Sequence, residues 1–366
     1  MRIFYLSDSV VPSTSANSIQ VMKMCHAFAK NGASVRLYAR HSSLDHEDDY
    51  AYYGIEPNFE IDKSTWYTIP TLGGIWYGIQ LRRKVLAHAR PDVLYGRDLY
   101  SLSWLVSAQY PFYYESHVPP PNRLRKYLEQ RILQSPYLQK LIVITDALKQ
   151  EYLRIFPQLS PDRIQVAHDG ADLPAAIQKI QQLPGRDRVI KIGYVGQLFA
   201  GKGIDIIVKV AAKLPELDFH IIGGKPEDIA NWKSEANLSN LYFHGHIPHG
   251  NLQGYFEAFD IMLLPNQEKV KIGGYRDIGP WTSPLKLFEY MSYKKAIVAS
   301  DLPVLREVLQ HEVNSLLCTP AVVDEWKQAV LRLADDAALR ERLGSTAYQQ
   351  FVARYTWQQR AEVVLA

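Results

Sequence analysis

Ser283-Pro284-Leu285-Lys286-Leu287-Phe288-Glu289-Tyr290 has the features of a helix start that holds an anion. Ser283 can cap the helix with its hydroxyl, and Pro284 suits the first helical position, where an N–H would have no partner anyway. The free amides that follow form a seat for an anion. Lys286 puts a positive charge in the first turn, where the macrodipole disfavours a cation unless an anion compensates. The stretch therefore predicts an anion-binding helix.

Glu289 lies three residues after Lys286 on the same flank of this helix. Its carboxylate can accept hydrogen bonds from two adjacent hydroxyls, such as those of a ribose. The two residues are equally consistent with a solvent-facing Lys–Glu contact. Both interpretations stay open at this point.

On both sides of this helix, short apolar runs alternate with segments of helical period, the pattern of parallel strands joined by crossover helices. The chain becomes polar between Ala175 and Arg188, which marks a domain boundary. We therefore expect an α/β protein with two Rossmann-like, doubly wound parallel-sheet domains, residues 1–178 and 186–354, facing each other across a cleft. A last helix, about residues 355–366, is expected to pack back on the first domain. The expected strands are Arg2–Leu6, Ser34–Ala39, Val93–Tyr95, Phe112–Glu115, Lys140–Ile144, Val189–Val195, Phe219–Ile222, Leu241–Phe243, Ile261–Leu264 and Ala296–Ala299.

The composition is that of an ordinary globular protein, with 47% hydrophobic and 22% charged residues in 366. This length exceeds the size at which single cores usually stop growing, which favours two domains. The formal net charge of +3 argues neither for nor against nucleic acid, which we do not expect as a partner. The two cysteines, Cys25 and Cys318, fit reduced thiols of a cytosolic protein.

Any membrane contact of this protein is expected at its surface and not through a spanning segment. The N-terminus turns polar too soon for a secretory signal, and no segment has eighteen uninterrupted apolar residues, so we expect a cytoplasmic protein. Arg123, Arg125, Lys126 and Arg131 stud one expected helix, Leu124–Gln134. A solvated helix face and docking on the anionic inner face of a membrane are both compatible with this pattern.

A second phosphate-type element follows the strand that ends at Val195. Gly196-Gln197-Leu198-Phe199-Ala200-Gly201-Lys202-Gly203 lies between this strand and a helix that begins at Ile204. Glycines around a lysine let the backbone approach a phosphate while the ammonium supplies charge. It is not a Walker A loop, because the spacing and the following Ser or Thr are absent. Alone it is a common surface turn, but with the Ser283 helix in the same domain a phosphate site is favoured.

Taken together, these motifs resemble the nucleotide-sugar-dependent glycosyltransferases of family 4, which have the two-Rossmann GT-B architecture. The resemblance covers nearly the whole chain. It implies that Lys202 contacts the donor diphosphate, that the backbone near Ile247 holds the base and that Glu289 binds the ribose. The resembling stretches are Gly193–Gln197 with Lys202-Gly203, Ile221–Gly224, Phe243–Pro248, Ser283–Tyr290 and Lys295–Ser300. The donor-binding residues expected in this way are Gln197, Lys202, Ile247, Ser283, Pro284, Leu285, Lys286 and Glu289.

Two positions depart from the family pattern. Gln197 occupies the position at which members usually carry Arg, so phosphate binding depends more strongly on Lys202. Members also pair two glutamates eight residues apart, and Trp281 occupies the first of these positions. The missing acid normally faces the transferred sugar. Arg276, Asp277 or the backbone around Gly279 are the candidates to replace it.

The first domain contributes two candidate elements. His117 ends Tyr113-Tyr114-Glu115-Ser116-His117, which resembles the family's cleft histidine motif and implies contact with the donor sugar. We expect His117 and Lys202 as catalytic residues; a structural histidine is the plainer alternative. Ser15, Ala16 and Asn17 lie where the family has paired glycines near acceptor and phosphate, although a Ser-rich helix cap explains this loop without a ligand.

We predict no catalytic metal and no cofactor besides the nucleotide sugar. No Asp-x-Asp occurs, and His244 and His246 have no nearby third ligand in the sequence that completes a zinc site.

The resemblance implies that a hexose is transferred with retention from a UDP-sugar to a saccharide or lipid-linked oligosaccharide. UDP-glucose is the donor that we expect first. Two alternatives remain. A UDP-sugar 2-epimerase of the same architecture needs acid and base carboxylates around the sugar, and the sugar side here lacks an acid. A non-catalytic two-lobed sugar-binding protein would agree with a hinge between two domains. It would not agree with the absence of an export signal or with the phosphate-directed lysines.

Overall fold

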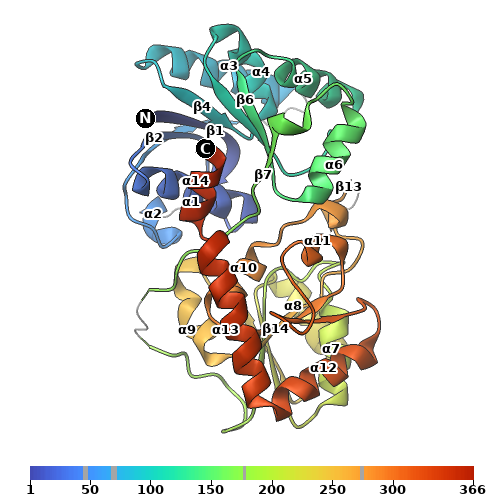
Figure 1. Ribbon diagram of the computed structural model, residues 1–366. Helices are drawn as coiled ribbons and strands as arrows, with labels where there is room; N and C mark the ends of the chain where they lie inside the picture. The colour runs from blue at the N-terminus through green and yellow to red at the C-terminus, as the bar shows by residue number, and fades with distance from the viewer. Residues whose placement is uncertain (44–47, 67–71, 176–178, 273–275) are drawn as a thin grey trace. The chain divides into compact units, whose positions relative to one another are not determined.

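The computed structural model describes residues 1–43, 48–66, 72–175, 179–272 and 276–366. These residues form two compact units, which we call unit 1 and unit 2 (Figure 1). Unit 1 comprises Met1–His168 together with Trp357–Ala366, and unit 2 comprises Asp169–Thr356. Residue 178, where the sequence analysis ended the first domain, lies outside the described residues. The units divide earlier, between His168 and Asp169.

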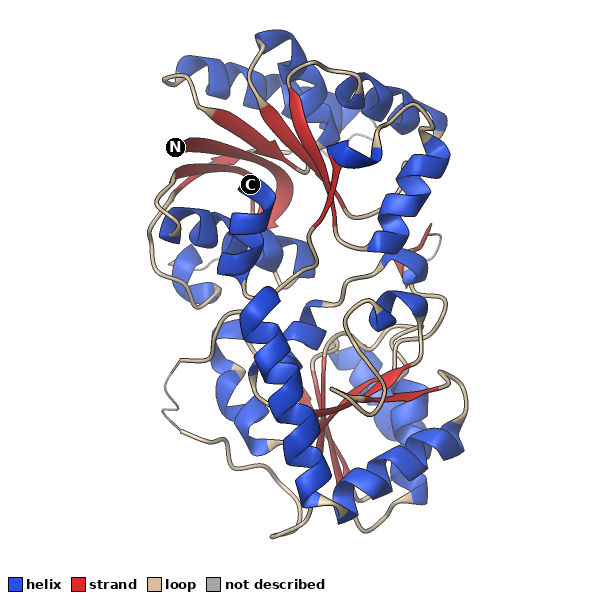
Figure 2. Cartoon of the chain, in the orientation of Figure 1, coloured by secondary structure: helices blue, strands red, loops and turns tan. Residues whose placement is uncertain are grey.

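Unit 1 is a seven-stranded parallel sheet in the order β3-β2-β1-β4-β5-β6-β7, with helices on both of its faces (Figure 2). Strands covered on both faces read as continuous apolar runs, and Ile3, Phe4, Tyr5 and Leu6 are all buried in β1. The elements of unit 1 are β1 (Arg2–Val11), α1 (Ala16–Lys30), β2 (Ser34–His41), α2 (Asp49–Tyr52), β3 (Glu60–Ser64), α3 (Leu72–Ala87), β4 (Val93–Gly96), α4 (Leu99–Leu105), η1 (Val106–Ala108), β5 (Phe112–Ser116), α5 (Arg123–Leu133), β6 (Leu138–Val143), α6 (Asp146–Ile155), η2 (Pro161–Arg163), β7 (Ile164–Val166) and α14 (Trp357–Leu365).

Unit 2 repeats this plan with a six-stranded parallel sheet in the order β10-β9-β8-β11-β14-β15. The predicted pair of parallel α/β domains is thereby confirmed. The elements of unit 2 are β8 (Lys191–Val195), α7 (Ile204–Lys213), β9 (Asp218–Ile222), α8 (Pro226–Ala236), β10 (Leu241–Gly245), η3 (His249–Asn251), α9 (Gln253–Ala258), β11 (Ile261–Leu264), β12 (Lys271–Ile272), β13 (Arg276–Asp277), η4 (Gly279–Trp281), α10 (Leu285–Ser292), β14 (Ala296–Ser300), α11 (Pro303–Arg306), β15 (Leu316–Cys318), α12 (Val323–Asp335) and α13 (Ala337–Arg354).

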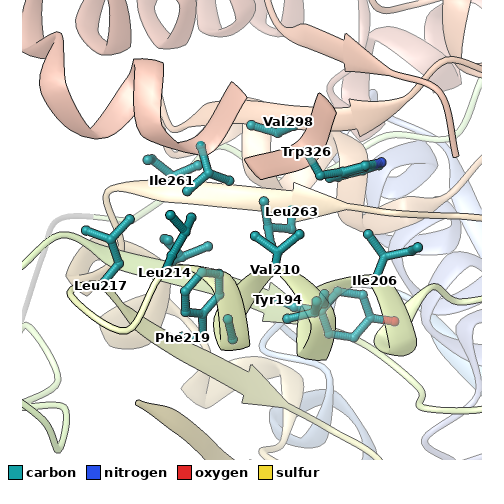
Figure 3. Close-up of a cluster of buried hydrophobic side chains, with 14 of the residues drawn as sticks. Tyr194, Ile206, Val210, Leu214, Leu217, Phe219, Ile261, Leu263, Val298 and Trp326 are labelled. Atoms are coloured by element: carbon teal, nitrogen blue, oxygen red, sulfur yellow. The ribbon is translucent and has the colours of Figure 1, made fainter. Parts of the chain in front are cut away.

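The core of unit 2 lies where α7 and α12 cover the sheet (Figure 3). Ile206 and Val210 of α7 and its C-cap residue Leu214 recur at helical spacing, so one face of this helix is apolar. They are buried in one cluster with Leu263 of β11 and Trp326 of α12. Each such side chain contributes about 1.5–3 kcal/mol by leaving water, so this cluster fixes the sheet against its helices.

Helix α14 belongs to unit 1, although it follows unit 2 in the chain. It packs on α1, where the Asn31 side-chain amide donates to the Gln358 carbonyl oxygen at 3.3 Å. Arg360 of α14 is 2% exposed, and its Nε donates to the His168 carbonyl oxygen at 2.9 Å. Over the described ranges, no helix combines the length and hydropathy needed to cross a bilayer.

Both sheets reverse their winding direction once, between β1 and β4 in unit 1 and between β8 and β11 in unit 2. In open parallel sheets, ligands bind beyond the carboxyl ends of the strands at such a reversal. The loops that follow β8 and β11 are therefore the first places to seek a ligand site in unit 2.

Candidate functional site

Three loops of unit 2 meet backbone to backbone at the carboxyl ends of β8, β9 and β10. The Gly223 N–H donates to the Gly245 carbonyl oxygen at 2.7 Å, and the Gly196 N–H donates to the Ile222 carbonyl oxygen at 2.9 Å. A Cβ at Gly223, where φ is +108°, would lie 2.1 Å from the Gly196 carbonyl oxygen. Only glycine fits this approach, which brings the backbones of the loops after β8 and β9 into direct contact.

Lys286 of α10 is the most informative side chain of the site. Its Nζ is buried and has no hydrogen-bond partner among the described residues. It lies 4.0 Å from the centroid of the Tyr194 ring, and a Cβ at Gly196 would stand 3.0 Å from it. Burial, and then repulsion from Lys202, hold the pKa of Lys286 well below that of an ordinary lysine, against an opposing effect of Glu289. A buried ammonium without an anionic partner is costly, so the site is suited to an anion.

Lys202 supplies a second positive charge to the same site. It lies in the loop between β8 and α7, next to Gly203, which has φ +76° and whose Cβ would lie 1.9 Å from the Pro265 carbonyl oxygen. The Lys202 Nζ is 5.2 Å from the centroid of the Phe199 ring. Burial lowers the pKa of Lys202 to about 8. Lys202 also lowers the pKa of Lys286, and the two ammonium groups together create a positive potential that favours a multiply charged anion.

The start of α10 differs from the expectation. Pro284, and not Ser283, is the N-cap residue, and the helix begins at Leu285 without a side-chain cap. The Ser283 hydroxyl instead accepts a hydrogen bond from the Asp169 N–H at 3.2 Å. The prediction that Ser283 caps the helix is therefore wrong, because its hydroxyl is used in a tertiary contact that local sequence does not reveal. Lys286 still falls in the first turn, as predicted.

Glu289 pairs with a histidine that the sequence analysis did not name. Its Oε1 lies 2.6 Å from Nε2 of His249, and both side chains are largely buried. This contact joins α10 to η3 and so places Glu289 beside the loop that carries Ile247. The signal for it was present in Phe243–Pro248, which ends one residue before His249. The carboxylate expected to bind ribose and the backbone expected to hold the base thus lie in adjoining segments.

Gln197 and Trp281 mark the two departures from the family pattern. Gln197 is exposed, and its carbonyl oxygen accepts a hydrogen bond from the Tyr194 hydroxyl at 2.8 Å. Asp277, a candidate to replace the missing acid, uses its Oδ1 to accept from the Val270 and Gly279 N–H groups, each at 2.9 Å. Its carboxylate therefore holds the loop before Trp281 in shape. The side chain of Arg276 lies outside the described residues.

In unit 1, His117 follows β5 and is held by the residue two positions earlier. Its Nε2 lies 2.5 Å from Oε1 of Glu115, which is completely buried. Ser15, Ala16 and Asn17, predicted as a loop, form the start of α1: Ala16 and Asn17 are its first two residues, and Ser15 is the N-cap residue without a side-chain hydrogen bond to the helix. The Ser15 hydroxyl therefore does not cap the helix as the Ser-rich cap interpretation requires. The nearby Ser18 hydroxyl donates to the Ser13 and Ser15 carbonyl oxygens.

The basic helix α5 exposes an apolar pair. Leu124 and Tyr127 are 47% and 59% exposed, and Arg123 and Arg131 are exposed on the same helix. A solvated face and a lipid-docking face both stay predictions, because either requires these side chains to be exposed.

His244 has a neighbour that sequence reasoning missed. Nδ1 of the buried His220 lies 3.1 Å from Nε2 of His244, and the two rings are stacked. Within the described ranges, no group of three or more His, Cys, Asp or Glu side chains could hold a metal ion. The expected metal independence stays a prediction.

Family models match both halves of the chain. Residues 18–174 match the model described as Glycosyltransferase Family 4, and residues 176–350 match the model described as Glycosyl transferases group 1. Alpha-D-kanosaminyltransferase from Streptomyces kanamyceticus is 24% identical over 230 residues, which are 59% of this chain and 56% of that protein. D-inositol 3-phosphate glycosyltransferase from Mycobacterium bovis is 25% identical over 265 residues, which are 68% of this chain and 51% of that protein. The chain thus spans about half the length of these curated relatives.

Solved structures share the whole fold. Sucrose-phosphate synthase from Thermosynechococcus elongatus superposes with a TM-score of 0.74 at 20% identity, covering 99% of this chain and 96% of that one. Anabaena HepE in complex with UDP gives a TM-score of 0.73 at 15% identity, covering 100% of this chain and 98% of that one. Two doubly wound parallel-sheet units of this kind are the GT-B fold. With its two family matches, the chain belongs to the GT-B glycosyltransferases of the family 4 type.

Proposed function

We propose that this protein transfers a hexose from a nucleotide diphosphate sugar, UDP-glucose or a related UDP-sugar, to a saccharide or lipid-linked saccharide. The observation that carries the proposal is the buried Lys286 ammonium, which lacks a hydrogen-bond partner among the described residues and shares its surroundings with Lys202. A diphosphate would supply the missing negative charge. The choice of UDP is supported by HepE, a protein of the same fold that was solved with UDP and with UDP-glucose.

The proposed chemistry follows from the charge that develops during transfer. Cleavage at the anomeric carbon leaves an oxocarbenium-like centre and an anionic diphosphate. Lys202, Lys286 and the first amides of α10 would stabilise this leaving group by several kcal/mol, because they are oriented before the reaction. These two ammonium groups can neutralise the diphosphate, so we propose a metal-independent reaction. We further propose that the configuration is retained and that His117 acts on the transferred sugar.

The test is transfer itself. Purified protein is incubated with UDP-glucose, UDP-galactose or UDP-N-acetylglucosamine and with glycan or glycolipid extracts, and UDP release is measured. We expect acceptor-dependent release from one donor, unaffected by a chelator, and a product whose anomeric configuration by NMR matches that of the donor. Donor epimerised without an acceptor would instead favour the 2-epimerase. Binding of a free sugar without UDP release under any condition would favour a sugar-binding protein.

UDP affinity is expected to fall as the pH rises through about 8, the pKa to which burial lowers Lys202. Only the ammonium form attracts the diphosphate, so one pH unit above this pKa the dissociation constant should be about tenfold higher. Without ligand the sign for stability is opposite: since the folded pKa lies below the ordinary 10.5, the penalty is full below about pH 8 and is relieved as the pH rises towards 10.5.

Calorimetry with UDP between pH 7 and 9.5 measures this step. Lys202→Arg is the matched control, because arginine keeps its charge throughout this range. The part of this step that comes from Lys202 should therefore be absent from that variant, which leaves only the titration of Lys286. An affinity that is flat with pH in the unmodified protein would contradict the role of Lys202.

A further inference from the structure

A buried polar network of unit 1 surrounds Glu115 of β5. Its Oε1 accepts from Nε2 of Gln20 at 2.7 Å and from Nη2 of Arg360 at 3.0 Å, and lies 2.5 Å from Nε2 of His117. Its Oε2 accepts from the Tyr95 hydroxyl. Four side chains from four different segments thus converge on one carboxylate that is completely buried.

The backbone explains why Glu115 meets His117. His117 directly follows β5 and lies two residues after Glu115, and its ring turns back so that Nε2 lies 2.5 Å from the carboxylate. Helix α14 brings Arg360, 245 positions away in the sequence, to the same carboxylate. A planar guanidinium that is itself buried and bonded to the His168 carbonyl oxygen gives the carboxylate a fixed partner.

The network keeps Glu115 ionised. Burial alone would raise the pKa of this carboxyl, but Arg360, then His117 and Arg97, hold it well below its usual range. An ionised carboxylate only accepts hydrogen bonds. Nε2 of His117 must therefore carry the hydrogen that is donated to Glu115, which defines the Nε2–H tautomer of the neutral ring.

We propose that Glu115, held by Arg360 of the C-terminal helix, is a positioning residue that fixes the ring orientation and the Nε2–H tautomer of His117. The catalytic part of this proposal rests on the proposed function, in which His117 acts on the transferred sugar. The C-terminal helix then has a role besides packing, because it supplies the cation that holds the carboxylate in place.

Glu115→Gln is the test, since it keeps the shape and removes the charge. Nitrogen-15 NMR of histidine-labelled protein reports the tautomer of His117, whose signal is assigned by its loss in His117→Asn. We expect the Nε2–H form in the unmodified protein and a mixture of tautomers in Glu115→Gln. We also expect kcat for transfer to fall roughly 10-fold or more, because the ring is no longer held in one tautomer, while the donor KM changes less than about twofold.

Two further variants keep the test decisive. Glu129→Gln removes another buried carboxylate of unit 1, one that accepts from the Tyr152 hydroxyl at 2.8 Å, and should leave the His117 signal and kcat unchanged. Arg360→Lys retains the charge but not the planar fork, and should shift the tautomer of His117 partly. It replaces Glu115→Gln as the test if that variant does not fold.

An unchanged tautomer in both Glu115→Gln and Arg360→Lys would overturn the proposal, and so would a changed tautomer with unchanged kcat. If the unmodified protein transfers no sugar, the proposed function fails, whereas the NMR result still decides whether Glu115 positions His117.

Discussion

Lys286→Met is expected to stabilise the unliganded protein and at the same time to weaken UDP binding. Methionine fills a similar volume without a charge, so the cost of burying an unpartnered ammonium disappears. The gain at pH 7 should be about 1–2 kcal/mol, or a melting temperature a few degrees higher for unit 2. Loss of a charged contact to the diphosphate costs about 1.5–3 kcal/mol, which is roughly a 10- to 150-fold weaker affinity.

The pH dependence of the stability gain identifies its source. The folded pKa of Lys286 lies well below the ordinary value of 10.5 because of burial and then Lys202. The wild-type penalty is therefore full below the folded pKa and fades as the pH rises towards 10.5. The advantage of Lys286→Met in thermal unfolding should shrink over the same range.

Lys209→Met is the matched control, because Lys209 is a 60% exposed lysine of unit 2 paired with Asp205. It should change neither the melting temperature nor the UDP affinity appreciably. A Lys286→Met protein that is less stable than the parent and binds UDP normally would show that Lys286 is a structural lysine. The proposed diphosphate site would then be wrong.

Most of the fold could be predicted because buried parallel strands are continuous apolar runs. The expected strand Ile261–Leu264 has the same bounds in the structure, and Phe112–Glu115 ends one residue early. The strands that were missed lie at sheet edges. Glu60–Ser64 is polar, and Ile164–Val166 and Leu316–Cys318 have three residues each. An edge strand needs pairing on one side only, so it carries a weaker pattern.

The site residues also differ in whether local sequence could predict them. Lys286 could be predicted because a lysine in the first turn of a helix conflicts with a local rule. The partners of Glu289 and Glu115 could not, since His249 and Arg360 lie 40 and 245 positions away in the sequence. Their contacts arise only when strands and helices are assembled. Motifs therefore located the charged groups, whereas the structure supplied what orients them.

Glu289→Gln is expected to weaken UDP binding about 10- to 100-fold, the effect of losing one or two hydrogen bonds to a charged acceptor. Binding of inorganic diphosphate should change less than about twofold, because it has no ribose. Lys286→Met, in contrast, should weaken both ligands. Calorimetry with the two probes separates a ribose contact from a phosphate contact. Glu216→Gln, an exposed carboxylate of unit 2, is the control that should alter neither.

The diphosphate measurement matters because Glu289 also acts on Lys286, whose pKa it raises against the effects of burial and Lys202. If Glu289 mattered only through that charge, its loss would reduce protonation of Lys286 and weaken UDP and diphosphate equally.

A comparison of two nucleotides also tests whether Glu289 contacts the ribose or acts only through the charge of Lys286. The unmodified protein should prefer UDP to 2′-deoxy-UDP by about tenfold, and Glu289→Gln should lose this preference, since the carboxylate and the 2′-hydroxyl form one interaction. A preference that survives in Glu289→Gln would mean that another group reads the ribose, and the pairing of Glu289 with His249 would then be structural.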